Sequence, residues 1–460
     1  MVFFSEEEGR RRRTTTTTTT TTTTRFETLN DFATTLSVPE SCNSKVAEFL
    51  LLQKQFWFYC WLFCSVNLFL LLLLLLLLSS SLSFLLSEKK GASFEDEASF
   101  FFVRSCSQAT EFLGIKRYLT TCRAVILSEF GGPDVLQVRE DVALPELGAS
   151  EVLVRTHAVG VNPLDLRMRG GYGSSLFKPL LPLVIGRDVS GEVTGVGNSV
   201  QRLHIGEQVF GALHPTATRG TYSDYAILHE EQLAHKPDNI SHIEAAAIPF
   251  AALTAWRALR STAQIKKGQR ILVMGGGGAV GLTAIQLAQS TECYVACTCG
   301  KRSMERVKEA GAMEVIDYTT PNIELQFTDS FDVVLDTIGL PETEAAGIRL
   351  LRAGGHYLTL QGETVTLADR YGLVAGGAAA AAVLLKKKIR YKQQYGIDYW
   401  WTIMRTDAEA LEEIARLTKD GRLKVPVGHT LPLEEAAEAH RVREGKKAHG
   451  KVVLEVKAES

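Results

Sequence analysis

The sequence has few cysteines and no excess of charge of either sign. Its 460 residues include eight cysteines without the paired C-x-x-C spacing of a structural zinc site, so we predict neither a disulfide scaffold nor a zinc lobe. Lys and Arg total 50 and Asp and Glu total 52, and beyond residues 10–13 no long basic stripe occurs. These features predict no nucleic-acid partner. The cysteine content favours a reducing compartment.

Residues 1–121 form a low-complexity leader that differs from the rest of the chain. It contains a threonine run at 14–24 and an uncharged stretch at 55–87, which exceeds the roughly 20 residues that cross a bilayer as a helix. Three interpretations stay open: a membrane anchor, a gene-model artefact from simple-sequence DNA, and a mitochondrial transit peptide. Segment 99–123 favours the third, because it combines Arg, Ser and Phe with a single acid. We predict a mitochondrial protein, with a cytoplasmic or membrane-anchored one as the alternative.

From residue 122 the sequence is typical of a compact α/β enzyme. Short Val- and Leu-rich runs separated by Gly and Pro turns predict a β-rich domain over 122–245. The pattern then changes, starting with a predicted helix at 244–259, to continuous apolar strands that alternate with helices. Such strands are expected in a parallel sheet that is covered on both faces.

A glycine loop is the sharpest motif of the sequence. Gly276, Gly278 and Gly281 satisfy G-x-G-x-x-G between an apolar strand at 271–274 and a predicted helix at 279–289. Without side chains, the backbone can approach a pyrophosphate, and the amides and dipole at the helix start stabilise its charge. The motif in this context predicts dinucleotide binding.

The end of the next strand predicts which dinucleotide binds. In NAD-binding proteins an acid at this place holds the ribose 2′-hydroxyl, whereas this chain has Gly300, Lys301, Arg302 and Ser303. Two cations and no carboxylate favour the 2′-phosphate of NADPH. The alternative is that both are solvated charges at a helix start. The three cysteines of this strand are interpreted as small buried side chains: Cys293, Cys297 and Cys299.

These motifs belong to a longer set that occurs in the order of one family. From about residue 122 to 456 the chain resembles the medium-chain dehydrogenase/reductase superfamily in its zinc-free quinone oxidoreductase branch. The residues that carry the resemblance are the glycine loop and the segments 130–136, 160–165, 180–191, 252–256, 315–318 and 450–454. Segments 167–173, 186–190 and 448–451 and the extended segment 369–401 are similar to the mitochondrial reticulon-interacting NADPH oxidoreductases within that branch.

The resemblance implies an α/β fold with two domains and a cofactor between them. A GroES-like β-rich catalytic domain, 122–245, would be completed by a C-terminal return at 393–460, and a Rossmann doubly wound parallel-sheet domain would occupy 246–392. It also implies a set of NADPH-binding residues: Gly277, Gly278, Ala279 and Val280 at the pyrophosphate, Gly300, Lys301 and Arg302 at the adenosine phosphate, Tyr318 at the adenosine, Thr337, Gly339 and Leu360 at the nicotinamide, and His449, Gly450 and Lys451 closing over it. Core packing of Tyr318 and a surface position of Lys451 are the alternatives.

Two of the positions that bind zinc in relatives carry other residues here. Asn162 stands at the position of the metal-binding cysteine, and Gly186-Arg187-Asp188 stands where these relatives carry the Gly-His-Glu motif. Because catalytic zinc needs three protein ligands, we expect a zinc-independent reaction. NADPH would then supply hydride to a quinone or a related activated carbonyl or alkene. Asn162 and Tyr172 are candidate donors near the nicotinamide or the accepting oxygen, and Asn162 as a turn residue before Pro163 is the alternative.

Two other functions stay open beside a quinone reductase. An enal or 2-enoyl thioester reductase would share the fold and the cofactor, and a partner-interaction protein would bind NADPH with little turnover. The alanine-rich run 373–385, followed by basic residues at 386–390, is too short to span a bilayer. As a helix it would cover the sheet, form a homodimer contact or rest on a membrane surface.

Overall fold

The computed structural model describes residues 121–321, 323–327, 329–445 and 449–457. The described residues belong to one compact unit, Arg117–Ser460. The expectations for the leader at 1–121 therefore lie almost wholly outside the described residues. Within the described part, no helix is both long enough and apolar enough to cross a membrane.

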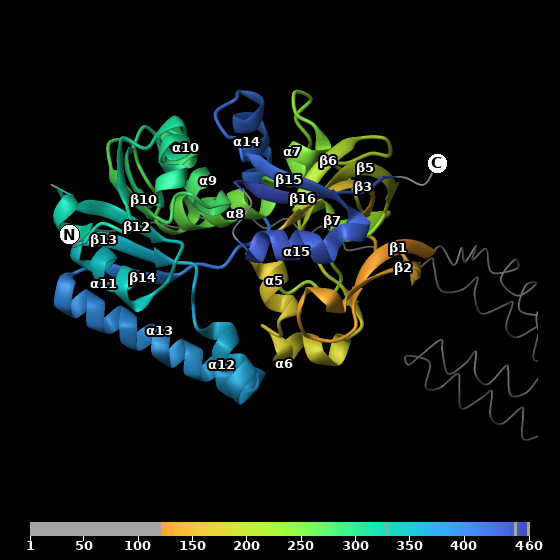
Figure 1. The fold of residues 1–460 in the computed structure, drawn as a ribbon, viewed down its shortest axis with the longest axis horizontal. Coiled ribbons are helices and arrows are strands. Elements are labelled where there is room, and N and C mark those ends of the chain that lie inside the picture. Colours follow the sequence, from red (N-terminus) through yellow and green to blue (C-terminus); the bar gives the residue numbers. More distant parts are fainter. Residues whose placement is uncertain (1–120, 322, 328, 446–448, 458–460) are drawn as a thin grey trace, which may run out of the picture. The chain divides into compact units, whose positions relative to one another are not determined.

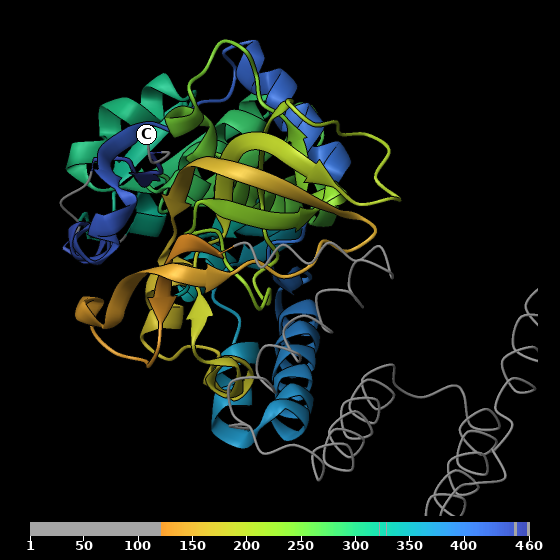
Figure 2. The same ribbon diagram turned by 90° about the vertical axis from the view of Figure 1, so that its right-hand side faces the viewer.

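The β-rich domain contains two sheets that use both ends of the described chain (Figures 1 and 2). In the larger sheet the strand order is β15-β16-β3-β5-β6-β8, and β7 also pairs with β3. The smaller sheet has the order β2-β1-β4. The strands are β1 Thr121–Leu127, β2 Leu136–Ala143, β3 Glu151–Val161, β4 Leu183–Val184, β5 Asp188–Val196, β6 Gln208–Ala212, β7 Tyr225–His229, β8 Leu233–His235, β15 Val427–Pro432 and β16 Lys451–Glu455. Because β16 pairs with β3, the C-terminal segment completes this domain, as the GroES-like fold predicts.

The second domain has a six-stranded parallel sheet with the order β11-β10-β9-β12-β13-β14. Its strands are β9 Arg270–Met274, β10 Tyr294–Cys299, β11 Glu314–Asp317, β12 Phe331–Asp336, β13 Leu351–Thr359 and β14 Asp398–Trp401. All six residues of β12 are buried, including Asp332 and Asp336, as expected of a strand in a sheet that is covered on both faces. The two-domain α/β fold predicted from the sequence is confirmed.

The parallel sheet extends beyond residue 392, the expected end of the Rossmann domain. Strand β14 pairs in parallel with β13, with Tyr399 opposite Tyr357, and this pairing buries Tyr399. A parallel neighbour needs a crossover connection, and the helix before β14 supplies it. The return to the β-rich domain therefore begins after Trp401 rather than at residue 393.

The helices flank the sheets or connect the two domains. Their bounds are α5 Pro163–Arg169, α6 Ser174–Phe177, α7 His242–Ala246, α8 Pro249–Trp256, α9 Ala279–Ser290, α10 Met304–Glu309, α11 Pro341–Arg349, α12 Thr364–Tyr371, α13 Leu373–Tyr395, α14 Ala408–Lys419 and α15 Ala436–Glu444. The helix predicted at 244–259 is split into α7 and α8, because Pro249 cannot continue α7 and starts α8 instead.

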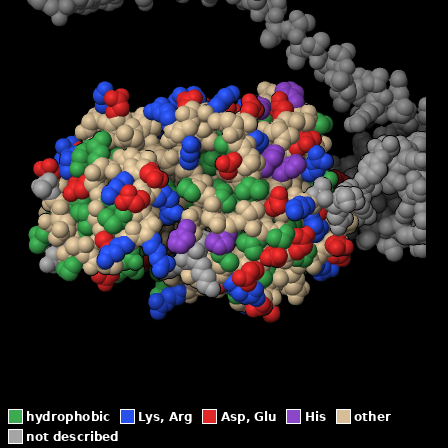
Figure 3. Space-filling model, turned by 45° about the horizontal axis from the view of Figure 1, so that its top comes forward, with side chains coloured by type: hydrophobic (Ala, Val, Ile, Leu, Met, Phe, Trp, Pro, Cys, Tyr) green, Lys and Arg blue, Asp and Glu red, His purple; other side chains and the backbone are tan. Residues whose placement is uncertain are grey.

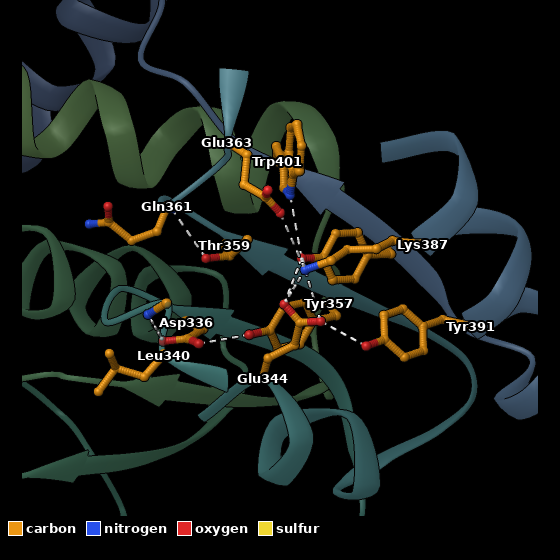
Figure 4. Close-up of polar contacts among 12 residues, drawn as sticks. Asp336, Leu340, Glu344, Tyr357, Thr359, Gln361, Glu363, Lys387, Tyr391 and Trp401 are labelled. Atoms are coloured by element: carbon orange, nitrogen blue, oxygen red, sulfur yellow. Dashed lines mark hydrogen bonds and ion pairs between the residues drawn. The ribbon is translucent and has the colours of Figure 1, made fainter. Parts of the chain in front are cut away.

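Helix α13 contains the alanine-rich run and packs beside β14 and α12 (Figure 1). On its inner side, Lys387 (2.9 Å) and Tyr391 (2.7 Å) donate hydrogen bonds to Glu344 of α11 (Figure 4). The hydroxyl of Tyr399 in β14 donates to the same carboxylate (2.9 Å). Its outer side exposes apolar side chains, with Val374 89% exposed. The helix thus covers the sheet edge, while the membrane-surface and homodimer contacts stay predictions.

The surface in Figure 3 carries charges of both signs close together. Lys and Arg side chains are interspersed with Asp and Glu on this face, without a continuous basic stripe.

Candidate cofactor and substrate site

The glycine loop lies between β9 and α9, where an added side chain would collide with its neighbours. A Cβ at Gly276 would strike the Cys297 sulfur, and one at Gly281 would lie 2.5 Å from the Gly275 carbonyl oxygen. Gly275 has a φ of +85°, a conformation that glycine adopts without strain. The loop is therefore packed tightly against β10 on its inner side.

The outer side of the same loop is open at the start of α9. A Cβ at Gly278, the residue that caps α9, would meet only the Gly275 carbonyl oxygen, at 3.9 Å. No side chain caps this helix start, and Ala279 and Val280 occupy its first turn. Free amides at the positive end of a helix fit a pyrophosphate. The residues present therefore fit the dinucleotide that the sequence predicts.

The predicted adenosine-side residues lie together at the end of β10. Gly300 precedes a short 3-10 turn, Lys301–Ser303, in which Lys301 and Arg302 are exposed. The ring of Tyr318 would lie 3.2 Å from a Cβ at Gly300, so Tyr318 covers this glycine. Tyr318 is 66% exposed, which excludes the core-packing alternative. The site thus has two cations and an aromatic face at one place.

Arg306, which sequence reasoning did not single out, connects the glycine loop to the C-terminal segment. Its guanidinium donates to the carbonyl oxygens of Gly277 (2.8 Å) and His449 (3.0 Å) and to the hydroxyl of Ser303 (3.2 Å). The only sequence signal was a basic residue in the helix that follows Lys301–Ser303. Arg306 fixes the loop backbone from the side of α10.

The predicted nicotinamide-side residues follow β12 and β13. Asp336 ends β12, and its carboxylate accepts hydrogen bonds from the backbone amides of Ile338 (2.8 Å) and Gly339 (2.9 Å). The same carboxylate accepts a hydrogen bond from the Tyr357 hydroxyl (2.7 Å), as Figure 4 shows. The Thr337 hydroxyl donates to the Met274 carbonyl oxygen (2.9 Å), so it is held against β9. The loop after β12 is therefore rigidly bound to the sheet.

The end of β13 lies beside this loop. Leu360 donates its amide to the Asp336 carbonyl oxygen (3.2 Å), and Gln361 follows it. Gly339 has a φ of +73°, and a Cβ there would strike the Gln361 side chain. Three predicted residues, Thr337, Gly339 and Leu360, thus share the carboxyl edge of β12 and β13, where ligands bind in α/β sheets.

Asn162 and Lys451 meet in the interior of the β-rich domain. The Lys451 ammonium donates to the Asn162 amide oxygen (2.6 Å) and to the Asp188 carboxylate (2.8 Å), and the Asn162 amide nitrogen donates to the same carboxylate (2.8 Å). Lys451 is 4% exposed, which excludes the surface-charge alternative. Asn162 also caps α5, as its turn interpretation predicts. Both polar ends of its side chain are therefore engaged by protein groups.

Arg187, which the resemblance places at a zinc-ligand position of relatives, is a fully buried cation. Its guanidinium donates to the carbonyl oxygens of Gly186 (2.8 Å), Pro215 (3.1 Å) and Ala217 (3.1 Å). Burial lowers the pKa of Arg187, and Asp165 opposes that shift. Among the described residues, no three His, Cys, Asp or Glu side chains lie close enough to hold a metal ion.

A buried polar chain runs from Arg169 to Asp165. The Arg169 guanidinium lies 3.3 Å from Nδ1 of His440, Nε2 of His440 lies 3.4 Å from the Tyr222 hydroxyl, and that hydroxyl donates to Asp165 (3.4 Å). Burial raises the pKa of Asp165 to about 6 and lowers that of His440 to about 3. This series of hydrogen bonds lies within the β-rich domain, and both of its ends, Arg169 and Asp165, belong to α5.

Tyr172 lies in the loop after α5, apart from the contacts of Asn162. Its ring is covered by the Arg167 guanidinium, whose central carbon lies 3.7 Å from the ring centroid. Burial raises the pKa of Tyr172, and the charge of Arg167 counteracts this. The structure thus separates the two candidate donors: Asn162 is enclosed, while Tyr172 faces Arg167.

Comparisons with known proteins agree with this geometry. The chain matches the family described as alcohol dehydrogenase GroES-like domain over residues 148–238 and that described as zinc-binding dehydrogenase over residues 310–454. It is 33% identical to the mitochondrial NAD(P)H oxidoreductase RTN4IP1 of Danio rerio over 358 residues, 73% of this chain and 92% of that protein.

Two further relatives show the range of the similarity. The chloroplastic NADPH-dependent alkenal/one oxidoreductase of Arabidopsis thaliana is 34% identical over 262 residues, 55% of this chain and 66% of that protein. The quinone oxidoreductase structure from Coxiella burnetii superposes with a TM-score of 0.63 at 26% identity, over 74% of this chain and 100% of that one.

Proposed function

The chain belongs to the medium-chain dehydrogenase/reductase superfamily of oxidoreductases, and from this premise we propose that it is an NADPH-dependent, zinc-independent reductase of quinones or related activated carbonyls or alkenes. The observation that carries the proposal is the open start of α9 behind the tightly packed glycine loop. Lys301 and Arg302 at the end of β10, with no acid in their turn, support NADPH over NADH.

The residues of the chain would bind and orient the two reactants. NADPH supplies the hydride when it is bound. Gly277, Gly278, Ala279 and Val280 would hold its pyrophosphate, and Tyr318 its adenosine. Thr337, Gly339 and Leu360 would limit the position of its nicotinamide, because their backbone is bound to the sheet.

We infer that Lys451 supports the site from within the β-rich domain and does not itself bind the cofactor. The Lys451 ammonium donates to Asn162 and Asp188. The His449 carbonyl oxygen, next to Gly450, is connected to the glycine loop through Arg306. Tyr172 would be the donor that remains able to face an acceptor, because Asn162 is 2% exposed and fully engaged.

A second candidate function is the reduction of the alkene of an enal or enone. The alkenal/one oxidoreductase of Arabidopsis thaliana and the 2-methylene-furan-3-one reductase of Solanum lycopersicum, 35% identical over 257 residues, favour it. An NADPH-binding protein that acts through a partner is the third. The mitochondrial names of several relatives support a mitochondrial location for this chain.

The decisive test follows NADPH absorbance with a short-chain ubiquinone analogue, with an enal and a 2-enoyl thioester as parallel acceptors and NADH as the parallel donor. We expect quinone turnover that prefers NADPH. Faster reduction of the enal or the thioester would support the second function. Tight NADPH binding without oxidation by any acceptor would support the partner-binding function.

The choice of NADPH has its own test in the double variant K301A/R302A. Removing both cations should weaken NADPH by about tenfold or more and leave NADH within about twofold, because charge-assisted hydrogen bonds to a phosphate contribute roughly 1.5–3 kcal/mol. Dissociation constants are measured by fluorescence titration. Equal loss for both cofactors would remove the 2′-phosphate argument. The variant K308Q, on the exposed side of α10, is a control for general charge.

A further inference from the structure

Arg167 of the β-rich domain contacts the other domain through the neutral side chain of Gln361. It lies in the last turn of α5, and its guanidinium donates to the amide oxygen of Gln361 (2.9 Å), which belongs to the other domain. The same guanidinium covers the ring of Tyr172. A cation, an aromatic ring and an amide therefore lie together at the boundary of the domains.

This cluster lies over the carboxyl edge of the parallel sheet. Gln361 follows Leu360 at the end of β13, and it is the residue that a Cβ at Gly339 would strike. Figure 4 shows Gln361 beside Thr359, whose hydroxyl oxygen accepts a hydrogen bond from the backbone amide of Gln361 (3.2 Å). Arg167 is thus next to the loops that the proposed function assigns to the nicotinamide.

Among the described residues, no carboxylate lies within ion-pair distance of the Arg167 guanidinium, and its hydrogen-bond partner Gln361 is neutral. The nearby Asp369 is engaged by the amides of Gly173 (2.8 Å) and Ser175 (2.9 Å). Arg167 is also exposed, so a ligand can reach it.

We propose that Arg167 is an anion-binding residue that determines substrate specificity: it binds an oxyanion group carried by the electron acceptor, while Tyr172 flanks the ring or chain of that acceptor. The proposal rests on the proposed function, whose hydride acceptor it describes further. A guanidinium presents its N–H groups in a fork that matches carboxylate, sulfonate or phosphate oxygens. The competing role is a structural latch, in which Arg167 only joins the domains through Gln361.

The test compares two acceptors that differ by one negative group, 1,2-naphthoquinone and 1,2-naphthoquinone-4-sulfonate. In the variant R167Q, the ratio of kcat/KM for the sulfonate to kcat/KM for the neutral quinone should fall by about tenfold or more. R167K should retain part of the sulfonate activity, because it keeps the charge without the fork. NADPH affinity, measured by fluorescence titration, should not change.

Two control variants separate charge from structure. Arg370 is another exposed arginine near a tyrosine ring, 5.3 Å from the centroid of Tyr371, and R370Q should leave both acceptors unchanged. Q361L removes the hydrogen bond between the domains but keeps the charge of Arg167, so it should keep the preference for the sulfonate. Equal losses for both acceptors in R167Q, or loss of the preference in Q361L, would establish the latch and overturn the proposal.

The proposal stays testable if no acceptor is reduced at all. That result would refute the proposed function, and binding would then decide the role of Arg167. In the presence of NADP⁺, naphthalene-1-sulfonate should bind R167Q about tenfold more weakly than the unmodified chain, while the neutral naphthalene-1-sulfonamide should bind both alike. Identical affinities of the sulfonate for the two proteins would overturn the anion site.

Discussion

Replacing His440 with glutamine should make folding less sensitive to acid. His440 is fully buried, and because an arginine can only donate, Arg169 fixes Nδ1 as an acceptor and leaves the proton on Nε2 toward Tyr222. Burial, reinforced by the charge of Arg169, lowers the pKa of His440 to about 3. A glutamine amide can accept from Arg169 and donate to Tyr222 without taking up a proton.

The size of the effect follows from proton linkage. Near pH 5 an unfolded histidine, with a pKa of about 6.5, is mostly protonated, whereas native His440 is neutral. Protonation of this histidine therefore lowers the free energy of the unfolded state, relative to the native state, by about 2 kcal/mol between pH 7.5 and pH 5. The stabilisation is complete above the unfolded pKa and is lost as the pH falls from about 6.5 toward 3. Near pH 5 native His440 stays unprotonated, so the change in unfolding free energy depends only on protonation of the unfolded state.

Asp165 acts in the opposite direction. Its pKa is raised to about 6, so protonation of the native carboxyl stabilises the fold as the pH falls through that value. Both proteins contain Asp165, so its contribution cancels when the variant is compared with the unmodified chain. The comparison therefore isolates His440.

The assay is urea unfolding followed by tryptophan fluorescence near pH 7.5 and near pH 5. Between the two pH values, the unmodified protein should lose about 2 kcal/mol more of unfolding free energy than H440Q. Any constant cost of the substitution appears at both pH values and does not affect the difference. Equal losses in the two proteins would show that His440 is not held neutral, and the reasoning would be refuted.

Two further substitutions test contacts of the site. G276A places a methyl group against the Cys297 sulfur and should weaken NADPH by about tenfold or more in a fluorescence titration, and C297A should restore part of the affinity, because it removes that sulfur. K451M leaves the buried Asp188 carboxylate without its cation and should lower the unfolding free energy by about 3 kcal/mol in urea at neutral pH, and D188N should recover part of the loss. An unchanged NADPH affinity in G276A, or an unchanged stability in K451M, would contradict the corresponding contact.

The features that could be predicted from the sequence are those whose geometry is local. The glycine loop needs only a strand, a turn and a helix in succession, so its place at Gly276–Gly281 and the turn at Lys301 follow from spacing. Burial of Cys293, Cys297 and Cys299 follows from their position in a strand of a covered sheet, and the structure confirms it.

The features that could not be predicted depend on partners far apart in the chain. Lys451 lies 289 residues from Asn162, and only the pairing of β16 with β3 brings them together. Arg306 looks like any basic residue of a surface helix until the backbone of His449 is placed beside it. The end of the parallel sheet could not be predicted either, because β14 is recognisable only from its pairing with β13.

The segment from His449 to Lys451 joins these non-local contacts. The His449 carbonyl oxygen binds Arg306, which also holds the glycine loop, and two residues later the Lys451 ammonium enters the β-rich domain to hold Asn162 and Asp188. Between them, Gly450 has a φ of +153°, and a Cβ there would strike the Pro426 carbonyl oxygen. The backbone therefore turns where no side chain fits. One short segment therefore contacts both domains: its His449 end reaches the glycine loop through Arg306, and its Lys451 end reaches Asn162 at the N-terminal end of α5.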